Sequence, residues 1–349
     1  MRGILDDSGV KTALPRYIDV VKRRSFPKFM IADSYEVDYT QNQTTEKLWM
    51  THDTMLEGFN EVQESTRGRP VRRDKSFLSL KTHIAHRMMG ECGFCLRDCG
   101  VDRLHGSKGY CGAGVDFRLF SAFPHMGEEP ELVPSGTVFT GGCSIRCIHC
   151  QNWDISQWRR RGSSVTPDVM AHQVKELADR GCYNLNMVGG DPTPYLWHWL
   201  ETFRNVEERI ATVWNSNSYY SLESAKLLAG FIDLYLLDFK YGNNGCAEEI
   251  SDAPGYWETC TGNHLMAKKY GELIVRVLVL PEHNECCTRP ILQWIKDNLG
   301  PMTRVNLMFQ YRPEWKARER PELSRRLTTK EISQAQSIAL EIGLTNLLH

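Results

Sequence analysis

The chain has 349 residues and a formal net charge of -1, with 42 Lys and Arg residues against 43 Asp and Glu residues. This balance gives no global attraction to nucleic acid or to an anionic membrane surface, so neither is expected as a partner. The sequence holds no run of about 20 apolar residues. Its start lacks the apolar core of a signal peptide, which predicts a cytoplasmic protein without a membrane span.

The first part of the chain is polar and rich in turn-forming residues. Residues 1–75 show no clear periodicity and are interpreted as an irregular amino-terminal extension that contacts a cofactor or the substrate. Residues 76–134 begin with the segment SFLSLKTHIAHRMM, whose apolar residues recur at helical spacing, with Ser76 as a candidate N-cap. This predicted helix leads directly into the first of two cysteine groups.

The first group follows the pattern C-x2-C-x3-C-x11-C and consists of Cys92, Cys95, Cys99 and Cys111. Four thiolates so close in sequence predict a closed metal site with no position left for a substrate. Zinc, a single iron ion and an iron–sulfur cubane all fit this pattern, so the metal is predicted to be iron or zinc. A closed site of this kind is structural or relays electrons.

Residues 135–349 alternate between short apolar runs and amphipathic segments, which is typical of an α/β fold with a parallel sheet. Strands are predicted at residues 137–142, 184–190, 211–217, 232–239, 272–281 and 304–311. Helices are predicted at residues 166–181, 195–210, 221–231, 262–271, 289–300 and 328–343. Six such units predict a partial (β/α)6 barrel, in which the chemistry lies at the carboxyl ends of the strands.

The second cysteine group lies in the loop after the first predicted barrel strand, within the segment TGGCSIRCIHCQNWDIS. Cys143, Cys147 and Cys150 can ligate three irons of a [4Fe-4S] cubane, and the fourth iron then stays open for another ligand. A zinc site that borrows His149 and a set of structural thiols are the alternatives. The spacing C-x3-C-x2-C resembles the radical S-adenosylmethionine (SAM) superfamily, in which SAM chelates the open iron.

This resemblance implies further SAM-binding positions at the other strand ends. The second predicted strand ends in a Gly-Gly-Asp motif similar to the Gly-Gly-Glu motif of the family, whose backbone contacts the SAM amino group. His149 stands where the family usually has an aromatic residue near the adenine. Arg276 is a charge inside an apolar strand and is expected to meet a carboxylate, either that of SAM or that of Asp238. The implied cofactor-binding residues are Gly189, Gly190, Asp191, Asn215, Ser216, Asn217, Asp238, Lys240, Arg276 and His149.

The segments CQNWDISQ, LLDFKYG and NLMFQYRP, together with the four-cysteine module, resemble the archaeal group of proteins similar to the pyruvate formate-lyase-activating enzyme. They also resemble the methanogen radical SAM methylases of methyl-coenzyme M reductase. The second resemblance implies a protein C-methyltransferase that acts on a glutamine of methyl-coenzyme M reductase, with cobalamin and an external reductant. The sequence lacks the Asp-x-His-x-x-Gly signature of the standard cobalamin domain, so any cobalamin would occupy a different kind of pocket.

Two other functions remain open at this level. One is an activating enzyme that generates a glycyl radical in a partner protein, and the other is an iron–sulfur electron carrier. No individual residue is assigned to catalysis. The five cysteines outside both groups are interpreted as buried or incidental thiols, and these are Cys182, Cys246, Cys260, Cys286 and Cys287.

Overall fold

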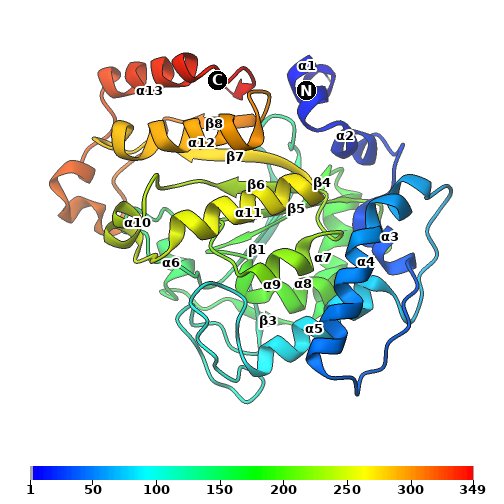
Figure 1. Ribbon diagram of the computed structural model, residues 1–349. Helices are drawn as coiled ribbons and strands as arrows, with labels where there is room; N and C mark the ends of the chain where they lie inside the picture. The colour runs from blue at the N-terminus through cyan, green and yellow to red at the C-terminus, as the bar shows by residue number, and fades with distance from the viewer. Residues whose placement is uncertain (1–2, 349) are drawn as a thin grey trace.

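In the computed structural model, which describes residues 3–348, a nine-stranded sheet runs through the molecule in the order β3-β1-β2-β4-β5-β6-β7-β8-β9 (Figure 1). Six consecutive members of this sheet pair in parallel. They are β2 (Ser135–Thr140), β4 (Asn184–Gly189), β5 (Ala211–Ser216), β6 (Leu234–Asp238), β7 (Glu272–Leu278) and β8 (Arg304–Met308). These are the six strands predicted from the sequence, so the partial (β/α)6 barrel is confirmed.

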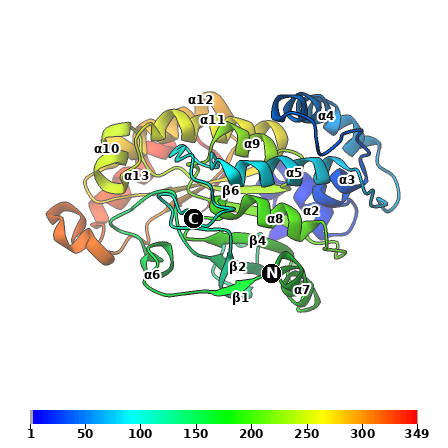
Figure 2. The same cartoon turned by 90° about the horizontal axis from the view of Figure 1, so that it is seen from below.

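Helices cover the outside of this barrel and connect its strands (Figures 1 and 2). Several of them begin where the sequence places the signals: Thr166 caps the first one, and Thr328 forms a capping box with Glu331 at the last. The helix at residues 244–251 was not predicted, and the helix predicted at 195–210 ends at Phe203. Gly343 ends that last helix in the left-handed conformation. The set consists of α7 (Pro167–Asp179), α8 (Leu196–Phe203), α9 (Leu222–Leu228), α10 (Asn244–Ser251), α11 (Tyr256–Tyr270), α12 (Arg289–Leu299) and α13 (Thr329–Ile342).

The sheet also has edge strands that the sequence did not predict. β1 (Phe117–His125) pairs antiparallel with β2 on one side and with β3 (Ser163–Val165) on the other. At the opposite edge, β9 (Leu347–Leu348) pairs with β8. Short helical turns complete the connections: α6 (Trp153–Ser156), η2 (Thr193–Tyr195), η3 (Asn284–Thr288), η4 (Trp315–Glu319) and η5 (Pro321–Leu323).

The amino-terminal extension is helical, and the prediction of an irregular segment was wrong. It contains η1 (Ile4–Asp6), α1 (Ser8–Ala13), α2 (Pro15–Val21), α3 (Lys28–Ser34) and α4 (Thr45–Ser65). In α4 the polar composition hides an apolar stripe of Leu48, Leu56 and Phe59, which are all buried against the main core. The N-cap Thr44 accepts a hydrogen bond from the backbone of Lys47.

The first two helices close the amino-terminal end of the barrel. Leu14 and Tyr17 are fully buried in a second apolar cluster with Ala211, Leu234 and Ile274, which lie near the starts of β5, β6 and β7. Glu272 accepts hydrogen bonds from the first backbone N–H groups of α2. The two chain ends lie on the same side of the molecule (Figure 1), where Asn346 donates to the carbonyl of Gly9.

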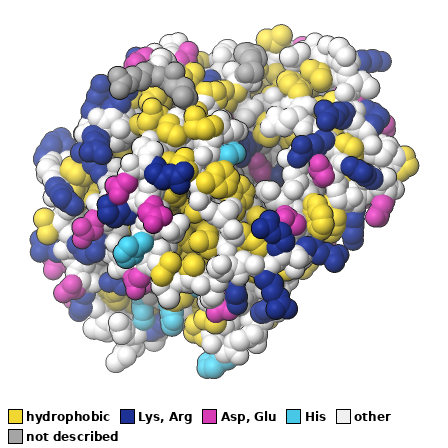
Figure 3. Space-filling model, turned by 180° about the vertical axis from the view of Figure 1, so that it is seen from behind, with side chains coloured by type: hydrophobic (Ala, Val, Ile, Leu, Met, Phe, Trp, Pro, Cys, Tyr) yellow, Lys and Arg dark blue, Asp and Glu magenta, His cyan; other side chains and the backbone are white. Residues whose placement is uncertain are grey.

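The predicted helix before the first cysteine group is α5 (Phe77–Gly90), with Ser76 in a capping box as expected for its N-cap. The chain from residue 91 to 116 then forms loops without a helix or strand. Among residues 3–348, no helix combines the length and the apolar character needed to cross a membrane. On the face shown in Figure 3, Lys and Arg side chains surround a central band of hydrophobic side chains, with Asp and Glu among them.

Candidate active site

The three cysteines of the second group line one cavity of about 440 Å³ at the carboxyl end of the barrel. The predicted SAM-binding residues come to the same cavity from four neighbouring strand ends. The lining includes Cys143, Cys147, Cys150, His149, Gly189, Gly190, Asn215, Ser216, Asn217, Asp238, Lys240 and Arg276. Most of the residues predicted from the sequence therefore share one wall, because parallel strands bring their carboxyl ends to one edge of the sheet.

The cysteine loop is held by its neighbours rather than by regular structure of its own. The backbone N–H groups of Arg146 and Ile148 donate to the carbonyls of Ser251 and Ile250 at the end of α10. The Arg146 guanidinium donates to the carbonyls of Cys143 and Tyr110, so it joins this loop to the four-cysteine module. These contacts fix the loop in place without using the cysteine side chains.

All three cysteines are free, with Cys143 and Cys147 buried and Cys150 half-buried in the cavity wall. Burial raises the pKa of Cys143 and raises that of Cys150 to about 11, so protons stay on these thiols until a metal displaces them. Asn217 places its side-chain nitrogen 3.3 Å from Cys143 Sγ, and Ser156 Oγ lies 3.4 Å from Cys150 Sγ. Hydrogen bonds to a ligating sulfur shift the reduction potential of a bound iron–sulfur cluster.

The Gly-Gly-Asp motif fits tightly against the cysteine loop. Gly189 has a φ of +149°, and a Cβ atom there would lie 2.4 Å from the carbonyl oxygen of Thr140. A Cβ atom on Gly190 would lie 2.2 Å from the carbonyl oxygen of Gly142. Only glycine permits this close packing of the motif against the start of the cysteine loop, and both glycines also line the cavity.

Asp191 turns away from the cavity and connects two strand ends. Its carboxylate accepts hydrogen bonds from the backbone N–H of Thr193 at 2.9 Å and from that of Asn217 at 3.0 Å. It also accepts from the hydroxyl of Ser216 at 3.0 Å. Burial raises its pKa above the ordinary value for an aspartate. Asp191 therefore positions Ser216 and Asn217 at the wall of the cavity.

Arg276 pairs with carboxylates that the sequence did not suggest. Its guanidinium makes two hydrogen bonds of 2.6 Å to Glu129 and another to Glu128. Asp238 lies beside Arg276 in the register of β6 and β7, but its carboxylate binds Lys240 Nζ at 2.6 Å instead. The expectation that Asp238 would be the protein partner of Arg276 was wrong. Glu128 and Glu129 follow β1, far away in sequence, so no local pattern indicated this pair.

His149 is a neutral, buried imidazole. Burial lowers its pKa to about 3, with a further contribution from the charge of Lys240. Its Nε2 lies 3.2 Å from the hydroxyl of Tyr241, and its ring meets the ring of Tyr311 edge to face at 5.8 Å. Within residues 3–348, His149 forms no close group with two cysteine sulfurs. This arrangement disfavours the zinc alternative and leaves the imidazole as part of an aromatic wall.

The four cysteines of the first group line a separate small cavity beside η2. The fully buried Arg103 lies in the same wall and donates to the carbonyls of Pro194 and Gly114. A Cβ atom on Gly109 would lie 2.3 Å from Cys99 Sγ, so this glycine makes room for the sulfur. The indole of Trp158 donates to the carbonyl of Cys111 and packs against the backbone of Gly142. The module thus braces the three-cysteine loop.

The sulfur atoms of these two groups are more widely spaced than the ligands of a formed mononuclear site. Tetrahedral zinc with Zn–S bonds of about 2.3 Å holds its sulfurs ~3.8 Å apart. Among the described residues, no three sulfurs of either group lie within 4.8 Å of one another. The cavity of about 440 Å³ beside the three-cysteine loop fits a cubane with one open iron, and the metal of the four-cysteine group stays a prediction of iron or zinc.

Comparison with known proteins places this geometry in context. The profile of the radical SAM superfamily matches residues 137–295, which include the cysteine loop and most of the barrel. The "Uncharacterized protein MJ0674" of Methanocaldococcus jannaschii is 39% identical over 344 residues, 95% of this chain and 98% of that protein. The "Uncharacterized protein MJ0808" of the same organism is 26% identical over 285 residues, 76% of this chain and 79% of that protein.

Two solved structures show a more distant likeness. TYW1 with a lysine-pyruvate adduct is 14% identical with a TM-score of 0.39, over 59% of this chain and 73% of that one. Streptococcus suis SuiB bound to the precursor peptide SuiA is 10% identical with a TM-score of 0.43, over 86% of this chain and 62% of that one. At these scores nothing about the substrate of this chain follows.

Proposed function

Because this chain belongs to the radical SAM superfamily, whose members are enzymes that use a [4Fe-4S] cluster and SAM, we propose that it abstracts a hydrogen atom from a residue of a protein substrate. The observation that carries the proposal is that the three cysteines and the polar ends of β4, β5, β6 and β7 line one cavity. When bound, the cluster supplies an electron to the sulfonium of SAM, which yields the 5′-deoxyadenosyl radical. The residues of the chain then have separate tasks.

Cys143, Cys147 and Cys150 would hold three irons of the cluster and leave the fourth iron without a protein ligand. We assign the SAM amino group to the backbone of Gly189 and Gly190, which both line the cavity. Asn215 and Ser216 at the end of β5 are the candidate partners of the ribose and carboxylate. Lys240 supplies a positive charge: burial alone would lower its pKa, but the carboxylate of Asp238 and the thiol of Cys147 raise it above the ordinary value.

The wall that remains free is suited to a substrate side chain. Leu278, Met308, Gln310 and Tyr311 line the cavity at the ends of β7 and β8, away from the Gly-Gly-Asp motif. Most of this wall is apolar, so it can exclude water from the carbon chain of a substrate residue. The amide of Gln310 can hydrogen-bond to the polar end of the same residue. We propose that this residue is a glutamine of methyl-coenzyme M reductase and that a hydrogen atom is removed from its carbon chain. The C-methyl product that the methylase resemblance implies would require a separate methyl donor, because the SAM that forms the radical is consumed in that step.

Cobalamin, which the methylase resemblance implies, does not fit inside this cavity. A volume of about 440 Å³ has to accept SAM and the substrate side chain, and a corrinoid macrocycle would need its own space. Within residues 3–348 the lining begins at His125, so the amino-terminal extension adds no wall there. A separate cavity of about 470 Å³ in the extension involves Arg16 and Arg67 at the opposite end of the barrel. We therefore derive no step through cobalamin.

The test is incubation of the anaerobically reconstituted protein with SAM, a reductant and methyl-coenzyme M reductase that lacks the modification. Formation of 5′-deoxyadenosine together with a 14 Da gain on a glutamine peptide is the expected result. The incubation is run with and without methylcobalamin. A mass gain that occurs only when methylcobalamin is present identifies it as the source of the methyl group. A glycyl radical signal in the partner without a mass gain would instead identify an activating enzyme, and the absence of 5′-deoxyadenosine would leave an electron carrier.

A further inference from the structure

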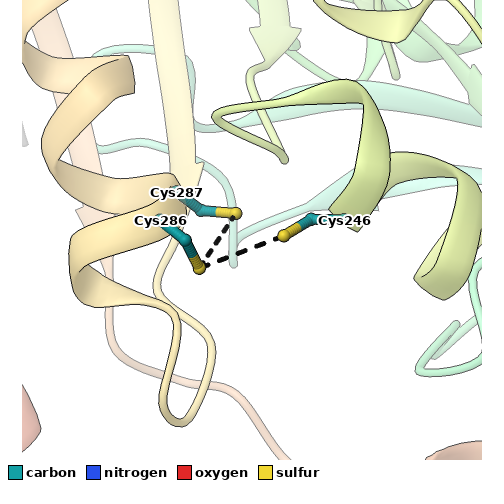
Figure 4. A group of neighbouring side chains, drawn as sticks. All are labelled: Cys246, Cys286 and Cys287. Carbon is teal, nitrogen blue, oxygen red and sulfur yellow. Dashed lines mark hydrogen bonds between the residues drawn. The ribbon is translucent and has the colours of Figure 1, made fainter.

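Three cysteines outside both predicted groups come together in the fold. Cys246 lies in the first turn of α10, and Cys286 and Cys287 lie in η3, a π-helical turn after β7 (Figure 4). The Sγ atom of Cys286 is 3.9 Å from that of Cys246 and 4.0 Å from that of Cys287. All three sulfurs lie within 4.8 Å of one another, and all three cysteines are free. The interpretation of these residues as incidental thiols therefore misses a structured group.

The spacing of this trio is that of a mononuclear metal site. Three thiolates around a tetrahedral ion with bonds of about 2.3 Å lie ~3.8 Å apart. The observed separations of 3.9 Å and 4.0 Å agree with that value. Within residues 3–348 this is also the one group of three or more Cys, His, Asp or Glu side chains with such short separations, so neither predicted cysteine group shares this geometry.

The two segments that carry the trio are held together by contacts that need no metal. Asn243 is the N-cap of α10, and its side-chain oxygen accepts the N–H of Cys246 at 2.8 Å. Its side-chain nitrogen lies 3.0 Å from the carbonyl oxygen of Cys286 and 3.3 Å from Cys246 Sγ. A Cβ atom on Gly242 would lie 2.6 Å from the same carbonyl oxygen. The trio is therefore preorganised by its backbone and by one asparagine.

We propose that Cys246, Cys286 and Cys287 bind one thiophilic metal ion of the zinc type through three thiolates. Binding converts three thiols into thiolates and releases their protons to solvent. Cys286 is exposed, whereas Cys287 is buried, so the fourth position of the ion faces solvent on the Cys286 side. Water or a small exogenous ligand completes the tetrahedron there.

The place of this ion in the fold gives it a role at the cluster cavity. Tyr241, directly before Gly242, has its hydroxyl 3.2 Å from the imidazole of His149 in the cavity wall. The ion would join the segment after β6, which carries Lys240 and Tyr241, to the segment after β7. It would thus stabilise the relative positions of two neighbouring segments of the cavity wall. π-Helical turns such as η3 are rare and often occur at functional sites.

The test compares the full-length chain with the variant Cys246→Ser/Cys286→Ser/Cys287→Ser, both anaerobically reconstituted with iron and sulfide and then equilibrated with Zn²⁺. Elemental analysis should find one equivalent of zinc less in the variant and equal iron in both. With Co²⁺ as the probe, the parent should gain a thiolate-to-cobalt absorption that the triple variant lacks. Cys182→Ser, which alters a cysteine outside all three groups, should behave like the parent.

If the triple variant does not fold, the single variant Cys286→Ser replaces it in the test. The Cys286 side chain is exposed, so this substitution should not disturb folding. It should keep the far-ultraviolet circular dichroism of the parent and weaken zinc binding by at least tenfold. Equal zinc content in parent and triple variant would overturn the proposal. So would a parent that takes up no zinc and whose mass shows two of these cysteines joined in a disulfide. Neither measurement uses SAM, so the result is independent of the proposed function.

Discussion

The two ends of the barrel are built from the same strands but differ in what they bury. At the carboxyl end, polar side chains and thiols line a cavity of about 440 Å³. At the amino end, α1 and α2 pack Leu14 and Tyr17 against the apolar starts of β5, β6 and β7. The carboxyl end is therefore suited to chemistry and the amino end to stability, a division typical of such barrels. Substitutions should therefore separate the two properties.

The largest expected effect is on chemistry at the carboxyl end. Cys147→Ser removes one of the three proposed iron ligands, and SAM cleavage should fall by roughly three orders of magnitude or more, to the background rate. The measurement is 5′-deoxyadenosine formed per chain under anaerobic reducing conditions, together with iron content. Cys182→Ser is the matched control and should keep the parental rate. A Cys147→Ser protein that still cleaves SAM would remove this loop from the site.

The next effect concerns stability at the amino end. Leu14→Ala deletes a fully buried side chain and should lower the free energy of unfolding by about 3 kcal/mol. Denaturant unfolding measures the loss, and Leu222→Ala on the exposed face of α9 should change it by less than about 0.5 kcal/mol. At temperatures where the variant is folded, its KM for SAM should equal that of the parent. A raised KM would show that the two ends are coupled.

Asp191 tests positioning at the carboxyl end with a smaller change. Asp191→Asn replaces one carboxylate oxygen by an N–H donor, so one of the donors from Thr193, Ser216 or Asn217 loses its acceptor. The cost of about 2 kcal/mol should appear as a KM for SAM raised roughly 30-fold. Cluster content should stay unchanged, because no cysteine is touched. Loss of the cluster with unchanged KM in the remaining holoenzyme would contradict the assignment.

The smallest effect is a pH dependence at the amino end. Burial raises the pKa of Glu272 from 4.5 to about 7, so the folded state holds this proton more tightly than the unfolded state. Its contribution to stability is complete below pH 4.5 and is lost as the pH rises through 7. Glu272→Gln should flatten the curve of unfolding free energy between these pH values. An unchanged slope would assign the pH dependence to other groups.

The sequence predicted the parts of the molecule whose signals are local. Each strand of the barrel is a short apolar run, and Cys143, Cys147 and Cys150 follow the first of them within a single loop. Their convergence with Asn217 and Lys240 followed from the rule for parallel strands. The helix α4 was missed because its buried residues are few among polar ones, although Thr44 and the spacing from Leu48 to Phe59 were available.

The remaining features depend on contacts between distant parts of the chain. Arg276 meets Glu129 across 147 positions, and Cys246 meets Cys286 across 40. Neither pair has a local pattern, because the folded barrel alone brings the ends of β1, β6 and β7 together. The position of Arg276 in an apolar strand predicted that it pairs with a carboxylate. The sequence alone did not indicate which of the 43 acidic residues supplies this carboxylate.

The central claim is that the three-cysteine loop supports cleavage of SAM in the cavity at the carboxyl end. The most direct measurement is the yield of 5′-deoxyadenosine from SAM and a strong reductant, with anaerobically reconstituted protein and the variant Cys143→Ala/Cys147→Ala/Cys150→Ala. Product should form with the parent and not with the variant, while the metal content of the predicted site at Cys92, Cys95, Cys99 and Cys111 should be the same in both. Equal yields from the two proteins, or no product from either, would contradict it.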